Sequence, residues 1–569
     1  MSTFIEILKS RFNDAAVKSL PPFTSPIEVA PSTNEKFGHY QFNSSMKFAK
    51  ELGMKPRDVS EKIIAALDQS GFEKIEIAGP GFINITLSPS FISEQLGKKL
   101  EHSKKERVIV EFSSPNVAKE LHVGHLRSTI IGESLARLFE YLGNDVIRLN
   151  HIGDWGTQFG MLIAHIQENH PHIFDGTEET DLPQLMGWYK ESKARFDADP
   201  EFKKRSQLQV VSLQGGDPSS RKAWEKICDI SRKGYQEIYD LLSVTLEERG
   251  ESFYQPMLKD VVDELSQKGL VQVSDGAKCV FVEGFKNREG EPLPLMVQKS
   301  DGGYNYDTTD MAAIRHRINE VKADRIIYIT DLGQQQHFHM VFKAAVMAGW
   351  YDPKTTRIDH VGFGLVLGPD GKKFKTRSGE TEKLIDLLFA GIDQADKILQ
   401  ERSPDLNADE RHKLAKALGL SAIKYADLSS HRTSDYTFSY EKMLRFEGNT
   451  AAFLMYSYVR ILGIKRKIGP RADELLKSAT LKLEHPSEIA LALHLAQFPE
   501  ALKQVEEELL PNRLTDYLYE LANKFNAFFR DCRVEGSDEE ASRLKLCDLT
   551  LSVMKDGFFI LGIETVDKM

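Results

Sequence analysis

The stretch SSPNVAKELHVGHLRST, residues 113–129, places two histidines around a glycine between an apolar segment and a long helical pattern. RVIVEF, from Arg107, predicts a buried strand, and the residues from His125 predict a helix. A strand, a short loop and a helix N-terminus bind phosphate, because the first helical turn presents unpaired N–H groups and a positive dipole end. Gly124 allows close approach to the backbone, and His122 and His125 are hydrogen-bond donors for phosphate oxygens. The stretch therefore predicts chemistry on a nucleotide, although a capped helix start with packed histidines would show the same pattern.

The surrounding sequence predicts an α/β domain. From Val108 onward strands such as NDVIRLNHIGD and RIIYITD alternate with long helices, which is typical of a parallel sheet with right-handed crossovers. A helical insertion is expected at about 170–300, with a strand pair in KCVFVEGFKNREGEPLPLMVQ near its end. Ligands of such sheets bind at the carboxyl ends of the strands, where residues 113–129 would lie.

Different patterns flank this domain, which we expect to span 106–440. Residues 1–100 predict a small α+β domain that ends in the strand–turn–strand segment IEIAGPGFINITL. Residues 441–569 contain four segments with apolar residues at spacings of three and four, which predicts a separate helix bundle. One of these segments is SEIALALHLAQFPEALKQVEEEL.

Composition limits the classes of protein that fit. The chain has 569 residues and a net charge of −10, and its apolar runs are too short to span a bilayer. Its four cysteines lack metal-ligand spacing, which favours a reducing cytoplasm and disfavours structural zinc. The negative charge disfavours a protein coated in nucleic acid, but local basic patches such as KRKIGPR can contact tRNA phosphates. Solvated helix faces would explain such patches equally well.

A second glycine-containing stretch is strongly basic. GPDGKKFKTRSGE, from Gly368, carries Lys372, Lys373, Lys375 and Arg377. Such a loop can close over a triphosphate and balance its charge. Alone it is compatible with an exposed basic turn; its position in the second half of the same predicted sheet favours a shared phosphate site.

Together these motifs resemble the two hallmark motifs of class I aminoacyl-tRNA synthetases. The strings EFSSPNVAKELHVGHLRST, NHIGDWGTQFG, SDGGYNYDTTDMAA, TDLGQQQHFHM and IKYADLSSHRTSDYTFS narrow the resemblance to arginyl-tRNA synthetases, and the similarity covers nearly the whole chain. The resemblance implies a Rossmann-like catalytic domain, an N-terminal additional domain that contacts the tRNA elbow and a C-terminal helical anticodon-binding domain.

The implied activity is ligation of L-arginine to tRNA(Arg) through arginyl-adenylate, with activation requiring bound tRNA. ATP would be a substrate accompanied by Mg²⁺, without a structural metal in the protein. The expected protein is a cytoplasmic monomer without membrane or DNA partners. A catalytically silent tRNA-binding or regulatory protein on a synthetase scaffold is the alternative.

The resemblance also assigns residues to ATP chemistry. The catalytic set would be Lys119, His122, His125, Lys373, Lys375 and Arg377. ATP would be bound by His122, Gly124, His125, His337 and Lys375. Thr376 stands where the general class pattern has a second lysine, and Lys119 is expected to supply the missing charge.

Arginine recognition requires carboxylates and aromatic faces, because a guanidinium is planar, always charged and offers five donors. By resemblance, Tyr306 and Asp310 contact the substrate side chain. Glu111 and Asn116 would bind the α-amino group and nearby polar atoms, with Gln334 completing the pocket. Strand packing of Tyr306 and a buried ion pair of Glu111 are the structural alternatives.

Four residues are expected to contact tRNA. Phe453 and Tyr456, one helical turn apart, would present aromatic faces to unstacked bases, unless they belong to a core stripe. By resemblance, Met569 lies near the anticodon, and Asn43 contacts a D-loop base.

Overall fold

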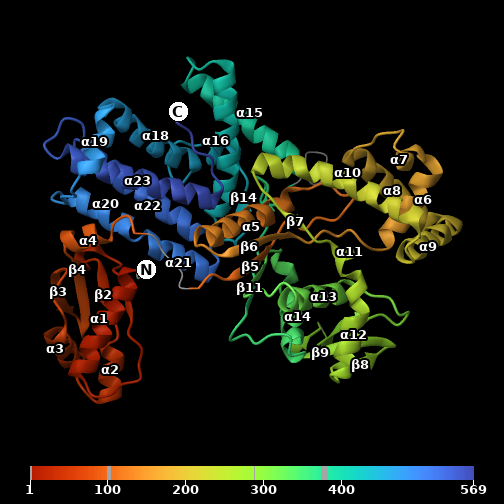
Figure 1. Ribbon diagram of the computed structural model, residues 1–569, viewed down its shortest axis with the longest axis horizontal. Helices are drawn as coiled ribbons and strands as arrows, with labels where there is room; N and C mark the ends of the chain where they lie inside the picture. Colours follow the sequence, from red (N-terminus) through yellow and green to blue (C-terminus); the bar gives the residue numbers. More distant parts are fainter. Residues whose placement is uncertain (1–2, 99–103, 288, 373, 375–381) are drawn as a thin grey trace. The chain divides into compact units, whose positions relative to one another are not determined.

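The computed structural model describes residues 3–98, 104–287, 289–372, 374 and 382–569. The chain forms two compact units (Figure 1). The first comprises residues 1–103, 446–559 and 565–569, and the second comprises 104–445 and 560–564. The predicted division into three domains, with boundaries near residues 100 and 440, stays a prediction, because the N-terminal and C-terminal parts of the chain belong to one compact unit.

The N-terminal part of the first unit is an α+β fold with an antiparallel sheet of order β1-β2-β4-β3. Its strands are β1 (Val29–Pro31), β2 (Tyr40–Phe42), β3 (Phe72–Ala78) and β4 (Phe82–Leu87). Its helices are α1 (Phe4–Ser19), α2 (Ser45–Leu52), α3 (Pro56–Ala66) and α4 (Pro89–Gln95), with a 3-10 turn η1 at Glu35–Phe37. The predicted strand–turn–strand is confirmed as β3 and β4. Strands β1 and β2 have three residues each, too few to show an alternating pattern.

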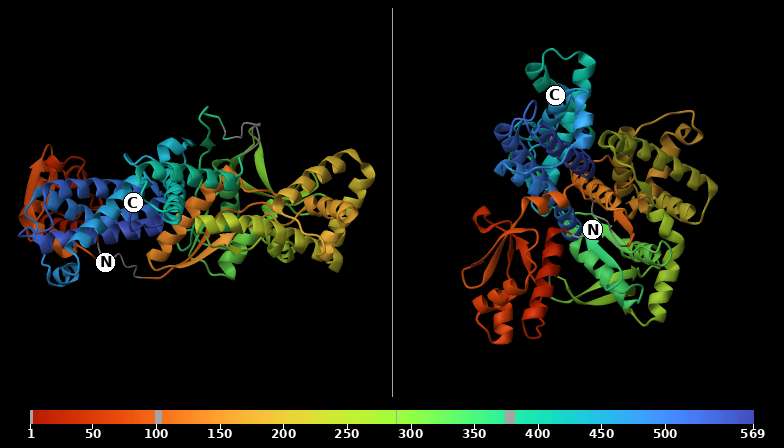
Figure 2. Two further views of the ribbon diagram at one scale, coloured as in Figure 1. Left: turned by 90° about the horizontal axis from the view of Figure 1, so that it is seen from above. Right: turned by 60° about the vertical axis from the view of Figure 1, so that its left-hand side comes forward.

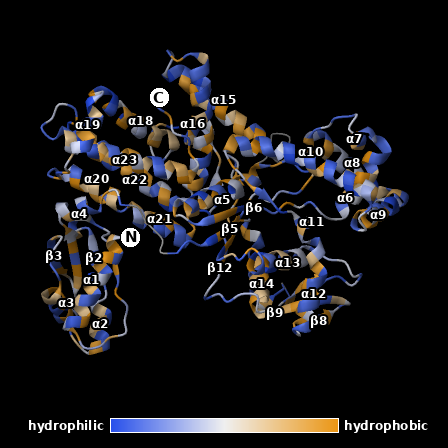
Figure 3. Cartoon of the chain, in the orientation of Figure 1, coloured by the Kyte–Doolittle hydropathy of each residue, from blue (hydrophilic) through white to orange (hydrophobic). Residues whose placement is uncertain are grey.

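The C-terminal part of the chain is helical, as predicted. Its helices are α18 (Ala451–Ile468), α19 (Arg471–Ser478), α20 (Pro486–Ala496), α21 (Phe498–Glu508), α22 (Asn512–Asp531) and α23 (Glu540–Leu561). Hydrophobic and hydrophilic residues alternate along each of these ribbons in Figure 3. The segment predicted as one helix from Ser487 is two, α20 and α21, because Pro499 removes a backbone donor and its ring clashes with the preceding turn.

The two parts of the first unit share a half-buried glutamate. Glu500 of α21 accepts a hydrogen bond from the backbone N–H of Ile5 at 2.9 Å and from the hydroxyl of Tyr40 at 3.0 Å. The Tyr40 side chain is completely buried, and its hydroxyl accepts from Gln497 at 3.0 Å. These bonds join the N-terminal α+β fold to the helical bundle within one compact unit.

The second unit is built on a five-stranded parallel sheet of order β12-β11-β5-β6-β7, which confirms the expected Rossmann-like α/β class. Its strands are β5 (Arg107–Glu111), β6 (Asp145–Asn150), β7 (Glu247–Glu248), β11 (Arg325–Tyr328) and β12 (Arg357–His360). Strand β5 has β6 on one side and β11 on the other, so the strand order reverses there. Ligands of open α/β sheets bind at this switch point, beyond the carboxyl ends of the strands.

Further elements surround the sheet. Its helices are α5 (Val123–Tyr141), α11 (Glu251–Tyr254), α12 (Leu258–Gln267), α13 (Tyr306–Asn319), α14 (Gln335–Met347), α15 (Leu384–Arg402), α16 (Ala408–Leu428) and α17 (Tyr440–Met443), with the short turns η2 (Gln255–Met257) and η3 (Leu332–Gln334). Strands β13 (Val366–Leu367) and β14 (Tyr436–Thr437) pair in parallel.

The helical insertion forms a lobe beside the sheet in both Figure 1 and Figure 2. It comprises α6 (Thr157–Asn169), α7 (His172–Asp175), α8 (Leu182–Ala198), α9 (Pro200–Gln214) and α10 (Pro218–Leu242). The predicted strand pair is confirmed as β9 (Ala277–Lys286) and β10 (Pro292–Gln298), which form a three-stranded sheet with β8 (Val271–Ser274).

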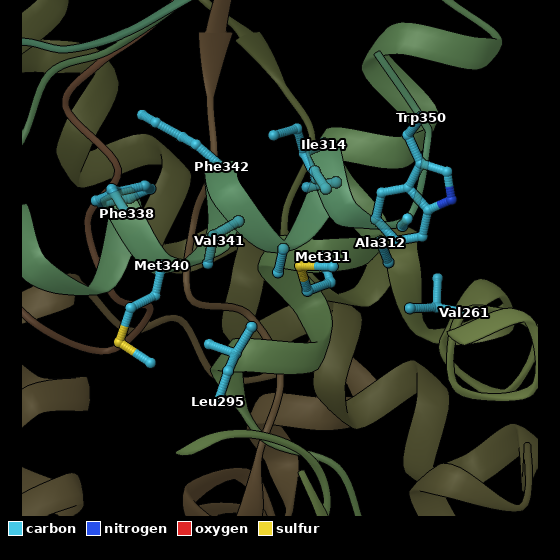
Figure 4. Close-up of a cluster of buried hydrophobic side chains, with 14 of the residues drawn as sticks. Val261, Leu295, Met311, Ala312, Ile314, Phe338, Met340, Val341, Phe342 and Trp350 are labelled. Carbon is cyan, nitrogen blue, oxygen red and sulfur yellow. The ribbon is translucent and has the colours of Figure 1, made fainter. Parts of the chain in front are cut away.

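A hydrophobic core holds helices α13 and α14 together (Figure 4). Met311 of α13 and Phe338 of α14 lie in this core and are at most 4% exposed. Each directly follows a polar residue of the candidate pocket, Asp310 and His337 respectively. Burial of Met311 and Phe338 thus orients the polar residue before each, because adjacent helical positions point about 100° apart.

No helix of the described residues is long and apolar enough to cross a bilayer.

Candidate active site

The loop after β5 adopts a strained backbone. Ser113, Ser114 and Ala118 have φ values of 69°, 47° and 59°, in the left-handed region that side chains other than glycine rarely adopt. The Ser128 hydroxyl accepts from the backbone N–H of Ser113 at 3.0 Å, and the Asn150 side chain accepts from that of Ser114 at 2.9 Å. The surrounding elements therefore hold this loop in one conformation.

Helix α10 of the insertion binds the same loop from its other side. The Tyr235 hydroxyl is 2.6 Å from the carbonyl oxygen of Asn116 and 3.0 Å from that of Lys119. The Ser231 hydroxyl accepts from the backbone N–H of Ala118 at 3.0 Å. The backbone on both sides of Val117 is thus attached to one helix, which positions the exposed Lys119 side chain in front of α5.

The two histidines cap α5. The His122 Nδ1 accepts from the backbone N–H of Gly124 at 3.0 Å, and the His125 Nδ1 accepts from the backbone N–H of His122 at 3.1 Å. Burial lowers the pKa of His125 to about 3, with the charges of His122 and Lys119 acting in the same direction. The neutral His125 ring therefore carries its proton on Nε2, because Nδ1 is an acceptor. That nitrogen is suited to donate to a phosphate oxygen.

Gly124 is required by the His122 ring. A Cβ at this position would lie 2.7 Å from Cε1 and 2.9 Å from Nδ1 of His122, closer than such atoms approach. The ring could not then cap the helix in its present orientation. Gly124 thus serves the geometry of the cap in addition to leaving the backbone open to a ligand.

The segment after the basic loop runs beside HVGH. The backbone N–H of Leu384 donates to the carbonyl of Leu121 at 2.9 Å, and His122 forms an isolated antiparallel bridge with Lys383. Lys383 also pairs with Glu120 at 2.8 Å. Residues 382–384, which follow the basic stretch, are therefore next to the first motif, and a phosphate site shared with the basic loop stays a prediction. Of the basic candidates, Lys373, Lys375 and Arg377 lie outside the described residues.

Glu111 forms a buried ion pair at the end of β5. Its carboxylate lies 2.5 Å from Nη2 of Arg317, whose side chain is fully buried. The guanidinium of Arg317 also lies over the ring of Tyr328, 5.1 Å from its centroid. Glu111 is thus a member of a buried ion pair, which was the structural alternative. That its remaining acceptor positions contact the substrate amino group stays a prediction.

The candidate guanidinium pocket combines carboxylates with a histidine. The His337 Nε2 lies 2.6 Å from Asp310, and its Nδ1 lies 3.4 Å from Asp307. The ring of Tyr306, which is 63% exposed, meets the His337 ring edge-on at 5.1 Å. Tyr306 begins α13 and is not packed in a strand, so its aromatic face is open. His337, expected on the ATP side, is paired with the carboxylates.

Asn116 and Gln334 are exposed at the same carboxyl edge. Asn116 bridges in parallel to Gly153, whose missing side chain makes room for it: a Cβ there would lie 2.1 Å from the Asn116 Oδ1. Gln334 donates to Asp331 at 3.0 Å, directly before α14. Both are placed where they can meet a ligand held by residues 111–125 and 306–337.

Family models match almost the entire chain. The model of the class I (R) tRNA synthetase catalytic domain matches residues 87–440, the DALR anticodon binding domain 454–569 and the arginyl tRNA synthetase N-terminal domain 5–87. The chain is 59% identical over 585 residues to an arginine–tRNA ligase of Protochlamydia amoebophila, with 100% of each chain covered.

The chain belongs to the arginyl-tRNA synthetase family.

Other relatives agree. An arginine–tRNA ligase of Chlamydia caviae is 52% identical over 575 residues and is also completely covered. The solved structure of the Plasmodium falciparum arginyl-tRNA synthetase has a TM-score of 0.89 at 36% identity over 100% of both chains. That of Thermus thermophilus has a TM-score of 0.81 at 22% identity, which shows the shared fold. The enzyme therefore attaches arginine to tRNA, and the catalytically silent alternative is not favoured.

The tRNA-binding candidates of the enzyme lie in the first unit. Tyr456 of α18 is 46% exposed, and the Arg460 guanidinium stacks over its ring at 4.8 Å. Phe453 is half-buried against Tyr519. Asn43 is half-buried with an unpaired side-chain oxygen, whereas its neighbour Phe42 is fully buried and offers no face to a base. Met569 is half-buried.

Sequence reasoning missed several residues around the site. Tyr235, Arg317 and Glu251 approach it from other segments of the chain, and Asp307 lies between the predicted residues Tyr306 and Asp310. Burial, together with the charges of Asp154 and Asp310, raises the pKa of Glu251 to about 7. The spacing of three between Asp307 and Asp310 puts both on one face of α13, which is the signal that could have found Asp307.

Proposed function

We propose that arginyl-adenylate forms in front of α5 and that this step requires bound tRNA. The capped helix start carries the proposal: neutral His125 and an exposed Gly124 lie at the sheet's switch point, beside residues 382–384. A carboxylate oxygen of arginine attacks the α-phosphate of ATP, which enters with Mg²⁺ held mainly by phosphates and water. The bond from the α-phosphate to pyrophosphate breaks. A terminal ribose hydroxyl of tRNA then attacks the adenylate carbonyl, and AMP leaves.

Rate enhancement in this proposal comes from positioning and charge stabilisation. His122 and His125 donate hydrogen bonds to phosphate oxygens while negative charge shifts to the leaving pyrophosphate. Lys119, held by its backbone to α10, supplies a cation beside them. Lys373, Lys375 and Arg377 complete the phosphate site from the basic loop.

The proposed arginine site uses the opposite side of the switch point. Asp310 pairs with the substrate guanidinium and Tyr306 covers its planar face, which suits a charged, flat group with several donors. Glu111, Asn116 and Gln334 contact the amino group and nearby polar atoms.

The proposed tRNA contacts are Asn43 in the N-terminal fold and Phe453, Tyr456 and Met569 in the C-terminal part. A base stacking on exposed Tyr456 would extend the stack already begun by Arg460. We also propose that the enzyme acts in the cytoplasm as a monomer.

Exchange of labelled pyrophosphate into ATP tests the proposal. We expect exchange only when arginine and tRNA(Arg) are both present, and we expect His125→Asn to reduce it by about 10²-fold. Equal exchange without tRNA would contradict the requirement for tRNA. Undiminished exchange by His125→Asn would contradict the role of the capped helix start.

A further inference from the structure

His337 occupies the carboxylates that the proposed function assigns to the substrate guanidinium. Both ring nitrogens face an acid, Nε2 toward Asp310 at 2.6 Å and Nδ1 toward Asp307 at 3.4 Å. The three side chains are only 10–20% exposed. A neutral imidazole has one donor, whereas a protonated ring has two, so only the cation can donate toward both carboxylates.

Contacts with neighbouring elements fix the positions of Asp307, Asp310 and His337. Asp307 also accepts from the backbone N–H of Met296 at 3.0 Å, which anchors it to β10. Met311 and Phe338, the neighbours of Asp310 and His337, are buried in the core shown in Figure 4. Burial opposes a charge on His337, but the hydrogen bond to Asp310 and the charges of Asp310 and Asp307 outweigh it and raise its pKa.

We propose that protonated His337 is the resident cation of the empty guanidinium site and gives up its proton when arginine binds to Asp310. The inference rests on the proposed role of Asp310. Two cations on one carboxylate repel each other, and a guanidinium cannot lose its proton in a protein. The proton of the imidazolium therefore passes to solvent, and the neutral ring remains beside the ligand as a hydrogen-bonding group.

This exchange has a consequence for selectivity. The resident cation keeps Asp310 and Asp307 paired while the site is empty, so neither carboxylate bears an uncompensated charge in a partly buried place. A ligand without a permanent positive charge could not replace the imidazolium electrostatically. His337 is thus a specificity-determining residue as well as a part of the pocket.

Other titratable groups lie around this site. Tyr306 of α13 meets the His337 ring, and the charges of His337 and Asp310 act on His360 of β12 and Glu251 of α11 respectively. His339 of α14 meets the ring of His360. Burial and the charges of His339 and Arg432 lower the pKa of His360 to about 4, so it stays neutral above pH 5. Two carboxyl groups are competing sources of a proton. Burial raises the pKa of Asp307, and burial together with the charges of Asp154 and Asp310 raises the pKa of Glu251 to about 7.

Calorimetric titration of the full-length enzyme with arginine tests the inference. Measuring the binding enthalpy between pH 6.0 and 8.5 in buffers of different ionisation enthalpy counts the protons released. We expect the count to approach about one per arginine at the acidic end and to fall at the basic end. The Kd should weaken by up to about tenfold per pH unit below the pKa of His337.

Three variants identify the group. His337→Asn should lose both the proton release and the corresponding slope of Kd against pH. Glu251→Gln and His339→Asn are matched controls and should retain the release. The inference would be overturned if His337→Asn still released a proton on binding arginine, or if Glu251→Gln did not. A proton count near zero for the wild type at every pH would also overturn it. Failure of the wild type to bind arginine at pH 8.5 would instead contradict the proposed arginine site.

Discussion

At the scale of single residues, the HVGH motif acts first as a helix cap. His122 and His125 satisfy backbone donors through Nδ1, and this leaves Nε2 as the proton-bearing nitrogen of neutral His125. The glycine between them is needed because the His122 ring occupies the space of a side chain. The same hydrogen bonds thus cap the helix and determine which ring nitrogen can donate to a phosphate.

Gly124→Ala tests this coincidence. The new methyl group would displace the His122 ring, so we expect arginine activation to fall by about 10²-fold, the cost of a misplaced reacting group. The unfolding temperature should change little, because the higher helix propensity of alanine and the loss of the His122 cap are each worth about 1 kcal/mol and oppose one another. Pyrophosphate exchange and thermal unfolding provide the two measurements.

Gly187→Ala is the matched control, since a Cβ at this helical position meets nothing within 4 Å. It should stabilise α8 by about 1 kcal/mol and leave activation unchanged. Normal activity in Gly124→Ala would show that the ring adapts and that the glycine serves only ligand approach.

At the scale of secondary structure, α10 positions the phosphate loop although it belongs to the insertion. Its N-terminus is capped by Asp217, which accepts from the backbone N–H of Ser220 at 2.8 Å, with Pro218 at the first helical position. Its far end supplies Ser231, Tyr235 and Tyr239 to the strained loop. The insertion is therefore part of the active-site framework.

Tyr235→Phe removes the hydroxyl that holds the carbonyls of Asn116 and Lys119. We expect a loss of about 1–2 kcal/mol in stability, since the carbonyls lose a buried partner. The kcat of activation should fall about tenfold with little change in the KM for arginine, because Lys119 serves the phosphates. Steady-state exchange kinetics separate these two constants.

Tyr351→Phe provides the control for that variant. Tyr351 follows the C-terminal end of α14, and its hydroxyl donates to the carbonyl of Phe342 within that helix at 3.3 Å. It should cost a similar stability without changing kcat. Equal loss of kcat in both variants would show that Tyr235 contributes only stability.

At the scale of the whole molecule, one compact unit contains both ends of the chain, and half-buried Glu500 hydrogen-bonds to the N-terminal part there. Burial raises the pKa of Glu500 to about 7, although the hydrogen bonds from Ile5 and Tyr40 act in the opposite direction. The folded protein therefore holds this proton at pH values at which the unfolded chain has released it. Its contribution to stability is complete below about pH 4.5 and is lost as the pH rises through 7.

Glu500→Gln should remove this pH dependence. The amide stays neutral, so at pH 8 the variant should be more stable than the wild type by up to about 3 kcal/mol, and at pH 5 the two should be similar. Thermal unfolding of the full chain across this range measures the difference. Glu61→Gln, at an exposed position of α3, should show no such trend. A constant difference between pH 5 and pH 8 would contradict a raised pKa of Glu500.

The sequence by itself determined the parallel sheet, the helical C-terminal part and the strand–loop–helix around residues 113–129, because hydrophobic periodicity and the strand–loop–helix pattern are local properties. It missed the helix break at Pro499, where a continuous apolar run hides the signal. It also missed the short strands β1 and β2, whose signals are weak. Only the tertiary structure decided that Glu111 pairs with Arg317, that His337 pairs with Asp310, and that Tyr235 holds the loop. These partners are 27 to 206 residues apart along the chain, so their contacts arise from packing of elements that no local pattern encodes.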